Sequence, residues 1–582
     1  MALAPELEQK ARQWLDGDPD LETRKELEGL LARKDEAELS DRFGAALEFG
    51  TAGLRGTLGA GPNRMNRAVV RRTTAGLARY LKAQVPDVAK RGVVIGRDGR
   101  IGSPEFLEDT AAVLCAEGIP AHVFEGVVPT PLVAHAVAAV NAAAGVMVTA
   151  SHNPPAYNGY KVYWGNGAQI IPPHDAGIAA AIDQIGPAKN VKLLSKSEAG
   201  TLWRVLPREV EEGYFKALAA LPLHPEIKRD ISIAYTPMHG VGNRFARRAL
   251  ADAGFARVET VPAQAEPDGR FPTVKFPNPE EPGAMDLVLA LATQMDAEIA
   301  LANDPDADRL AVAVRTEKGK YTQLTGNEVG ILLGHYLLTE AKADPKRLVI
   351  TTIVSSSQLG VMARELGVGY DETLTGFKWI ANRAMEREKS EGARFVFGFE
   401  EALGYTVGTV ARDKDGVGAA LMVAELAAVA KSRGRTLIQE LGEVQRRFGL
   451  FAASQKSLTM PGASGGAAIK GIMTAFREKP PANIGGHAVA ALRDLKRGTR
   501  TAAGKTEKLS LPPSDVIVYE LEGDARIVLR PSGTEPKIKF YFERKEPVAA
   551  GEAIDAARAR AGKALNGLQD AFMKLVEAAQ PK

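Results

Sequence analysis

Apolar and polar positions follow two different periods along most of the chain. Three segments share one pattern, in which a β-branched strand leads through a polar loop into a helix with apolar residues at helical spacing. These segments are RGVVIGRDGRIGSPEF at residues 91–106, DISIAYTPMHGVGNRFA at 230–246 and RLVITTIVSSSQLGVMA at 347–363. The alternation predicts three related α/β units with mixed or parallel sheets, whose ligand loops follow the carboxyl ends of the strands.

The two ends of the chain have a different pattern. Residues 1–45 are rich in Glu, Lys, Leu and Ala at helical spacing, which predicts a helical extension with a packing role. After about residue 450 we expect a helix, three strands and a closing Ala-rich helix, which together indicate an α+β domain on an antiparallel meander. The predicted helix lies at 466–478 and the strands at 515–523, 525–531 and 537–544. The charged stretch Arg497–Lys508 is interpreted as a solvated loop.

A chain of 582 residues exceeds the usual length of one domain, so we expect several hydrophobic cores. The fold class predicted is α/β, with three related mixed α/β domains and a C-terminal α+β domain around a central cleft. The predicted boundaries are 1–45 for the helical extension, then 46–210, 211–325, 326–450 and 451–582 for the four domains.

Composition narrows the class of partner. Hydrophobic residues make up 45% and charged residues 25%, which is typical of a soluble globular protein. Because 74 basic residues nearly balance 71 acidic ones, we expect neither nucleic acid nor a membrane as a partner, and favour small molecules. The single cysteine, Cys115, and the acidic N-terminus with Glu6 and Glu8 predict a cytoplasmic protein. We expect a monomer and leave an oligomer open.

The stretch TASHNPPAYNGYK, residues 149–161, places polar side chains directly after an apolar strand. Pro154 and Pro155 prevent an immediate helix, so Ser151 lies on a rigid loop. Its hydroxyl could act as a nucleophile or phosphate carrier, with His152 or Lys161 as a proton-transfer group. A turn that satisfies its own backbone is the alternative interpretation.

A second motif, ANDPDADRLAVAV, places Asp304, Asp306 and Asp308 at alternate positions between two strands. Three carboxylates so close together repel each other without a counter-ion, and their oxygens suit Mg²⁺. A calcium loop of the EF-hand type is disfavoured, because Arg309 occupies the position that such a loop reserves for glycine. A solvated acidic turn is the alternative interpretation.

Three further loops are weaker signals taken one by one. The loop RPSGTEP has the composition of an anion cradle, built from Arg530, Ser532, Gly533 and Thr534. FGFEEALGY and ARDKDG offer Glu400 and Lys414 for sugar hydroxyls and a phosphate, and TLTGFKWIA offers Thr375, Gly376 and Lys378 at a strand-to-helix turn. A hydroxyl, a carboxylate cluster, a sugar-type loop and an anion cradle, one per predicted unit, indicate a site shared among domains.

With these four motifs in this order, the chain resembles the α-D-phosphohexomutase superfamily, within it the branch of phosphoglucomutase-2-like and bacterial phosphoglucomutases. TASHNPPAYNGYK resembles its phosphoserine loop, DPDADR its metal loop, GFEEALGY its sugar loop and RPSGTEP its phosphate loop. The resemblance implies a TBP-like fourth domain and a phosphoglucomutase. Such an enzyme interconverts glucose 1-phosphate and glucose 6-phosphate through a phosphoserine and glucose 1,6-bisphosphate, with Mg²⁺ as cofactor.

The same resemblance assigns roles to residues. It implies that Ser151 carries the phosphoryl group and ligates the metal beside Asp304, Asp306 and Asp308. Lys161 would handle the hydroxyl proton, with its pKa lowered by burial beside other cations. Catalytic roles are implied for Ser151, Lys161, Arg55 and His152, and substrate binding for Arg309, Thr375, Gly376, Lys378, Glu400, Lys414, Arg530, Ser532, Gly533 and Thr534. Lys414 would assist the distal phosphate loop across the cleft from the metal.

Two positions depart from the family's pattern. Ala402 replaces a serine of the sugar loop, and Phe377 stands where other branches have tryptophan or histidine, so both are expected to affect sugar recognition. Alternatives that stay open are a phosphopentomutase, a phosphomannomutase and a glucose-1,6-bisphosphate synthase. An aspartyl phosphatase and a non-catalytic sugar-phosphate sensor are less favoured.

Overall fold

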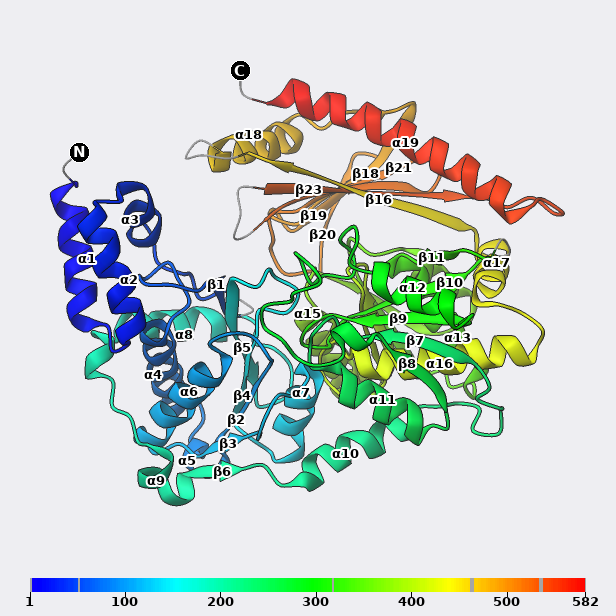
Figure 1. The fold of residues 1–582 in the computed structure, drawn as a ribbon. Coiled ribbons are helices and arrows are strands. Elements are labelled where there is room, and N and C mark those ends of the chain that lie inside the picture. The colour runs from blue at the N-terminus through cyan, green and yellow to red at the C-terminus, as the bar shows by residue number, and fades with distance from the viewer. Residues whose placement is uncertain (1–2, 51–52, 317–318, 461–464, 533–536, 581–582) are drawn as a thin grey trace. The chain divides into compact units, whose positions relative to one another are not determined.

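The structure is a computed structural model that describes residues 3–50, 53–316, 319–460, 465–532 and 537–580. The chain forms two compact units (Figure 1). Unit 1 contains Met1–Leu324 and Ala402–Gly434, and unit 2 contains Thr325–Glu401 and Arg435–Lys582. Each unit is described by itself.

Unit 1 begins with the three helices predicted for the N-terminal extension, α1 (Pro5–Gly17), α2 (Leu21–Arg33) and α3 (Glu36–Phe43). Asp20 and Asp35 cap α2 and α3 by accepting hydrogen bonds from backbone N–H groups. The helices bury a small apolar cluster of their own that includes Leu27 and Leu39. The extension is therefore a packed layer with its own core.

The first sheet of unit 1 has the strand order β1-β5-β4-β2-β3-β6. Strands β4, β2, β3 and β6 are parallel, and β5 and β1 are added antiparallel. Its strands are β1 (Leu54–Thr57), β2 (Val93–Arg97), β3 (Ala121–Val123), β4 (Ala144–Val148), β5 (Tyr157–Trp164) and β6 (Trp203–Val205). Its helices are α4 (Arg67–Gln84), α5 (Val88–Arg91), α6 (Ser103–Ala116), α7 (Thr130–Ala139), α8 (His174–Asp183) and α9 (Lys196–Ala199). Cys115 is buried in α6.

The second sheet of unit 1 has the order β11-β10-β9-β7-β8, with β7 parallel to both of its neighbours. Its strands are β7 (Ser232–Thr236), β8 (Arg257–Thr260), β9 (Ile299–Asn303), β10 (Leu310–Arg315) and β11 (Tyr321–Gln323). Around it lie α10 (Arg208–Ala219), α11 (Gly242–Asp252), α12 (Asp286–Gln294) and α16 (Gly416–Ser432), which follows β15 (Gly404–Val407). Helix α16 packs on α11, β9 and β10, so a segment distant in sequence completes this layer.

Unit 2 begins with a parallel sheet in which β12 (Arg347–Thr352) lies between β13 (Gly369–Thr373) and β14 (Arg394–Glu400). The surrounding helices are α13 (Gly326–Glu340), α14 (Gln358–Glu365), α15 (Phe377–Glu391) and α17 (Leu437–Phe448). Strand, loop and helix follow one another in β2–α6, β7–α11 and β12–α14, which confirms the three α/β units expected from the sequence. None of the described helices combines the length and the apolar composition needed to cross a membrane.

The C-terminal part of unit 2 is an antiparallel sheet covered by α18 (Gly465–Glu478) and by the long α19 (Ile554–Ala579), red in Figure 1. The strand order is β16-β23-β22-β21-β18-β19-β20, and β17 (Asn483–Ile484) pairs with β18. The strands are β16 (Leu450–Thr459), β18 (His487–Asp494), β19 (Thr499–Ala502), β20 (Lys505–Lys508), β21 (Ile517–Leu521), β22 (Ala525–Pro531) and β23 (Lys537–Glu546). The meander confirms the predicted α+β domain.

One prediction for this domain was wrong. The stretch Arg497–Lys508, interpreted as a solvated loop, contains the hairpin β19–β20. Ala503 and Gly504 both adopt positive φ angles, 47° and 76°, which form the tight turn that a two-residue hairpin needs. Arg500 and Glu507 pair across the two strands, and all four residues of β20 are exposed, so the stretch is solvated as predicted but is a hairpin and not a loop.

The two sheets of unit 2 share a core. An apolar cluster joins Ile353, Val354 and Leu374 of the parallel sheet to Val516, Val518, Val528 and Tyr541 of the C-terminal sheet. Beside it, Arg526 on β22 forms ion pairs with Glu372 at 2.9 Å and Glu543 at 3.1 Å, and Arg493 pairs with Glu372 at 2.6 Å. This set is hereafter called the Glu372 cluster. The two sheets are thus held by both apolar burial and paired buried charges.

Candidate active site

Ser151 lies where its loop leaves β4, the central buried strand of the first sheet. The residue is 2% exposed and its φ is +50°, a left-handed conformation that a serine rarely adopts. Its backbone N–H donates to Thr149 Oγ1 at 2.8 Å, and its hydroxyl donates to Asp304 Oδ2 at 2.8 Å. The loop therefore fixes Oγ toward a carboxylate of the neighbouring sheet.

The Ser151 loop is held by Arg100, a residue that we did not single out in the sequence. Its side chain is fully buried and lies 3.4 Å from Asp98, with which it forms an ion pair. Its guanidinium donates to four backbone carbonyls of the loop, those of Ser151, Asn153, Pro154 and Tyr157. A planar guanidinium with several donors suits this bridging better than a lysine. The sequence offered one signal for this residue, because the charged residues of GRDGR follow directly on the apolar residues of strand β2.

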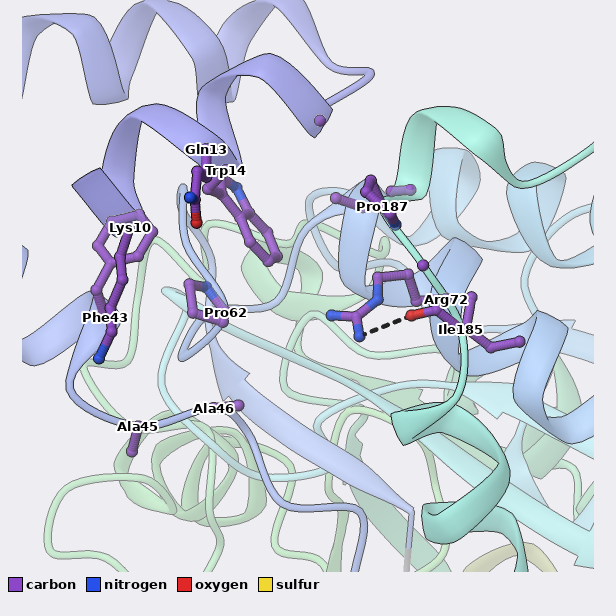
Figure 2. A pocket seen from close by; sticks show the side chains of 14 residues that line it. Lys10, Gln13, Trp14, Phe43, Ala45, Ala46, Pro62, Arg72, Ile185 and Pro187 are labelled. Carbon is purple, nitrogen blue, oxygen red and sulfur yellow. Dashed lines mark hydrogen bonds between the residues drawn. The ribbon is translucent and has the colours of Figure 1, made fainter. Parts of the chain in front are cut away.

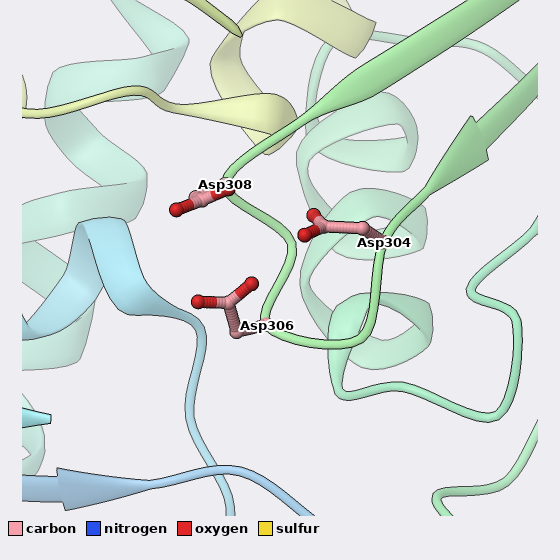
Figure 3. Close-up of side chains that lie close together, drawn as sticks. All are labelled: Asp304, Asp306 and Asp308. Atoms are coloured by element: carbon pink, nitrogen blue, oxygen red, sulfur yellow. The ribbon is translucent and has the colours of Figure 1, made fainter. Parts of the chain in front are cut away.

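Asp304, Asp306 and Asp308 lie on the tight connection between β9 and β10, and their carboxylates converge (Figure 3). One oxygen of each lies within 4.8 Å of the others, and all three residues are buried. Ala307 adopts a positive φ of 53°, which bends the chain between the second and third aspartate. The three aspartates that alternate in the sequence therefore bring their carboxylates together in space.

Two lysines neutralise the aspartate cluster. Lys161 on β5 places Nζ 2.7 Å from Asp306 and 2.9 Å from Asp308, and Lys414 places Nζ 3.2 Å from Asp308. Burial disfavours the charged form of Lys161, but the two carboxylates outweigh it and raise its pKa. The prediction of a lowered Lys161 pKa was wrong, because it considered neighbouring cations and not the aspartates.

The pKa values of Asp304 and Asp308 shift in opposite directions. Burial, and then repulsion from Asp306 and Asp308, raises the pKa of Asp304 well above its ordinary value. Burial also raises the pKa of Asp308, but Lys161, Lys414 and Arg309 lower it by more, so its pKa falls below the ordinary value. The two lysines thus stabilise the ionised form of Asp308 more than that of Asp304, the carboxyl group next to Ser151.

The residues present fit a divalent cation. Oδ1 of Asp306 and Oδ1 of Asp308 are buried without a hydrogen-bond partner among the described residues, which is costly unless another group binds them. Carboxylate oxygens, together with the nearby Ser151 hydroxyl, are the hard ligands that Mg²⁺ prefers. When bound, Mg²⁺ would neutralise charge on a transferring phosphoryl group.

Three other predicted residues surround Ser151. His152 places Nδ1 3.2 Å from Ser151 Oγ, and burial followed by repulsion from Arg309 and Arg55 holds its pKa well below the ordinary value. The same surroundings therefore disfavour the protonated form of its imidazole. Arg55 on β1 donates to Asn153 Oδ1 at 3.1 Å, and the backbone N–H of Arg309 donates to Asp304 Oδ1 at 3.0 Å.

Lys414 is positioned by a buried loop that precedes α16. Its neighbour Asp413 accepts hydrogen bonds from the Tyr163 hydroxyl at 2.7 Å and from the Gln169 amide at 2.6 Å. Lys414 lies 3.4 Å from Asp413 and belongs to unit 1, beside the metal carboxylates. The resemblance predicts that Lys414 assists the distal phosphate loop, whereas the structure places its ammonium group 3.2 Å from Asp308.

Asp415, the next residue, predicts a measurable pH dependence of stability. Burial raises its pKa from 3.8 to about 6, although Gly418 N–H and the Tyr214 hydroxyl donate to it. The folded protein therefore holds a proton that the unfolded chain releases between these pH values, so folding stability falls as pH rises through this window.

Asp415→Asn removes that titration and keeps a good helix cap. The free energy of unfolding of the variant, relative to wild type, should increase by about 2.4 kcal/mol between pH 4 and pH 7. Urea unfolding at both pH values measures this difference. An offset that is equal at pH 4 and pH 7 would contradict the assigned pKa.

Unit 2 brings together the residues predicted to bind the sugar. Glu400, at the end of β14, is 8% exposed, and its Oε1 accepts a hydrogen bond from Gly376 N–H at 2.6 Å. Gly376 has a φ of +117°, and the adjacent Thr375 hydroxyl is buried without a partner among the described residues. Lys378 lies on the first turn of α15, with Nζ 6.0 Å from the Trp379 ring centre. These groups form one polar cluster.

Phe377 corrects a prediction. Its side chain is 3% exposed and packs in an apolar cluster with Leu348, Ile350, Ile380 and Phe395. It therefore supports the start of α15 from within the core. The expected effect on sugar recognition rested on the tryptophan or histidine of other branches at this position, and the structure places the side chain in the apolar core instead.

The phosphate loop connects β22 and β23. Arg530 on β22 pairs with Lys539 in register, and Ser532 N–H donates to the Lys537 carbonyl at 2.7 Å. Gly533 and Thr534 lie outside the described residues. Arg530 and Ser532, both half-buried, thus lie at the N-terminal end of the predicted cradle.

Four domain models of one protein family match this chain in consecutive segments. The descriptions "Phosphoglucomutase/phosphomannomutase, alpha/beta/alpha domain" I, II and III match residues 46–189, 212–319 and 325–447, and the C-terminal domain matches 479–561. A phosphopentomutase of Mus musculus is 38% identical over 93% of this chain and 90% of its own. A "Probable phosphomannomutase" of Haemophilus influenzae is 42% identical over 84% of this chain and 95% of its own.

Among solved structures, the open form of the phosphoglucomutase parafusin from Paramecium has a TM-score of 0.65 at 18% identity. The match covers 92% of this chain and 96% of that one, and it supports the fold alone. With four matched domains in order and relatives above 30% identity along nearly the whole chain, this protein belongs to the phosphoglucomutase/phosphomannomutase family, within the α-D-phosphohexomutase superfamily of phospho-sugar mutases.

Proposed function

We propose that the chain interconverts α-D-glucose 1-phosphate and glucose 6-phosphate through a phosphorylated Ser151 and bound glucose 1,6-bisphosphate. The observation that carries the reaction type is the Ser151 hydroxyl, fixed 2.8 Å from Asp304 inside a buried carboxylate cluster that fits Mg²⁺. Phosphoryl transfer depends mainly on positioning and charge neutralisation, and this cluster supplies both.

The bonds exchanged are phosphate esters. In the first step the P–Oγ bond of phosphorylated Ser151 breaks as a P–O bond forms to the sugar 6-hydroxyl, which gives its proton to a base. After the bisphosphate turns over, the P–O bond at the sugar 1-oxygen breaks as a P–O bond forms to Ser151 Oγ, and the serine proton passes to the sugar 1-oxygen. Lys161, a cation 2.7 Å from Asp306, would donate a proton to the departing sugar oxygen, and Arg309 would hold the phosphoryl oxygens. His152 Nδ1, 3.2 Å from Oγ, would orient the serine hydroxyl.

The remaining assignments concern sugar and distal phosphate. Glu400 would bind sugar hydroxyls, and the unpaired Thr375 hydroxyl would donate to a ligand oxygen. Further substrate contacts are assigned to Arg55, Gly376, Lys378, Lys414, Arg530, Ser532, Gly533 and Thr534. Sugar phosphates as the only partners, a monomeric state and a cytoplasmic location also stay predictions.

A pentose 1-phosphate is the second candidate substrate. It is favoured by the 38% identity to a protein named phosphopentomutase, and a mannose phosphate is the third. The half-buried Ala402, which offers no hydrogen bond from its side chain, bears on this choice because a pentose has fewer hydroxyls to satisfy.

Relative kcat/KM values on glucose, mannose and ribose 1-phosphates, with and without glucose 1,6-bisphosphate, test the proposal. We expect glucose 1-phosphate to be used at least about tenfold better, since each hydrogen bond to a charged group such as Glu400 contributes about 1.5–3 kcal/mol. Faster turnover of ribose 1-phosphate than of glucose 1-phosphate would show that the preferred substrate is a pentose phosphate. Full activity of protein that carries no phosphoryl group on Ser151 and receives no bisphosphate would contradict the phosphoserine cycle.

A further inference from the structure

Two adjoining cavities lie between the N-terminal helices and the first sheet domain of unit 1. The first, about 500 Å³, is lined by α1, by the segment after α3 and by α4 (Figure 2). The second, about 550 Å³, continues toward β1. Ala45, Ala46, Pro62 and Arg72 line both cavities. Volumes of this size hold small organic ligands.

The walls of the first cavity combine apolar surface with positive charge. Trp14, Phe43, Pro62 and Ile185 supply apolar surface, and Lys10 and Arg72 are the charged residues of its lining, which includes no acid. Figure 2 shows Arg72 between Ile185 and the space bounded by Trp14 and Pro62. The lining therefore complements a molecule that is mostly apolar and carries one negative group.

Polar groups beside this cavity have incomplete hydrogen bonding. One amino group of Arg72 donates to the Ile185 carbonyl at 3.1 Å, while its Nε–H has no partner among the described residues. The indole N–H of Trp14 is likewise buried without one. Unpaired buried donors are costly, so an anionic acceptor placed by Arg72 would be strongly favoured.

The cavities are connected to the active site through β1. Leu54, which lines the second cavity, directly precedes Arg55, and Arg55 donates to Asn153 in the Ser151 loop. Leu47 N–H donates to the Pro62 carbonyl at 2.9 Å, and the Leu47 side chain packs closely on Gly56, with no room for a Cβ there. A ligand that moves this wall would therefore move the strand that carries Arg55.

We propose that the first cavity binds a small molecule with an apolar body and one carboxylate, and that its binding alters turnover through β1. The carboxylate pairs with Arg72 while Trp14, Phe43 and Pro62 enclose the apolar part. This site is separate from the sugar-phosphate site and has a different ligand chemistry.

Binding is tested with 8-anilinonaphthalene-1-sulfonate, a fluorescent probe with an apolar body and one anionic group. One equivalent of the probe should bind the full-length protein. Energy transfer from tryptophan to the bound probe should be weaker in Trp14→Phe, because this variant lacks the tryptophan that lines the cavity. Decanoate should displace the probe at least about tenfold better than decanol, because only the acid pairs with Arg72. Equal displacement by both would overturn the carboxylate assignment.

Variants locate the site. Ala46→Trp fills the shared wall from an exposed position and should abolish probe binding, and Arg72→Met should weaken it at least about tenfold. Arg79→Met is the matched control, because Arg79 lies on the same helix, is exposed and lines neither cavity. Unchanged probe binding by Ala46→Trp overturns the proposed site.

The effect on turnover is tested separately. Saturating decanoate should change the kcat of the wild-type protein and leave the kcat of Ala46→Trp unchanged. An unchanged wild-type kcat overturns the coupling to Arg55.

Discussion

Ser151→Ala is expected to lower kcat for sugar-phosphate interconversion by at least about 10⁴-fold, because the hydroxyl that carries the phosphoryl group is lost. The substitution removes one buried hydroxyl, whose hydrogen bond goes to Asp304, so the fold should persist. Steady-state rates with glucose 1-phosphate measure the loss. Intact mass after incubation with glucose 1,6-bisphosphate should show an added phosphoryl group on wild type and none on the variant.

Ser232→Ala serves as the control for this loss. Ser232 is equally buried in unit 1, and its hydroxyl donates to the Glu298 carboxylate at 2.6 Å, far along the sheet from the aspartate cluster. It should retain wild-type kcat and phosphorylation. Turnover that survives in Ser151→Ala would instead favour an aspartyl nucleophile and refute the phosphoserine mechanism.

Arg100→Lys should lower kcat about 10²-fold while changing KM by only a few-fold. Lysine keeps the positive charge beside Asp98, but a single ammonium group cannot bridge the four loop carbonyls that the guanidinium holds. Loss of those contacts allows Ser151 to leave its left-handed conformation, and misplacement of a reacting group by about 1 Å costs about this factor. Steady-state kinetics and the rate of Ser151 phosphorylation measure the effect.

Arg91→Lys is the matched control for Arg100. Arg91 also donates to loop carbonyls, those of Asn141 and Ala142, but at the opposite end of β4 from Ser151. Both variants should lose stability, whereas only Arg100→Lys should lose phosphorylation rate. If both variants keep wild-type kcat, or if KM rises in proportion as kcat falls, then Arg100 does not act by positioning Ser151.

Much of the fold and the main site could be predicted from local patterns. The three strand–loop–helix segments and the C-terminal meander are each encoded within short windows, where periodicity and turn residues decide the element. Ser151 and the three aspartates could be predicted for the same reason, since each group lies on one loop directly after a buried strand.

The rest depends on contacts between distant residues. The pKa of Lys161 is set by Asp306 and Asp308, far along the chain, and Lys414 joins them because α16 packs in unit 1. Arg100 acts through carbonyls some 50 positions later, which no spacing rule reveals. Phe377 shows the same limit, because only the packed structure distinguishes a core aromatic from one that contacts a ligand.

The Glu372 cluster has a consequence for how this protein can be divided. Removing the C-terminal domain would take both arginine partners away from Glu372. The same cut would expose the apolar side chains of Ile353, Val354 and Leu374 to water. Residues 325–401 of the third domain and the C-terminal domain, which share unit 2, should therefore unfold together, and we expect neither part to fold when it is expressed without the other.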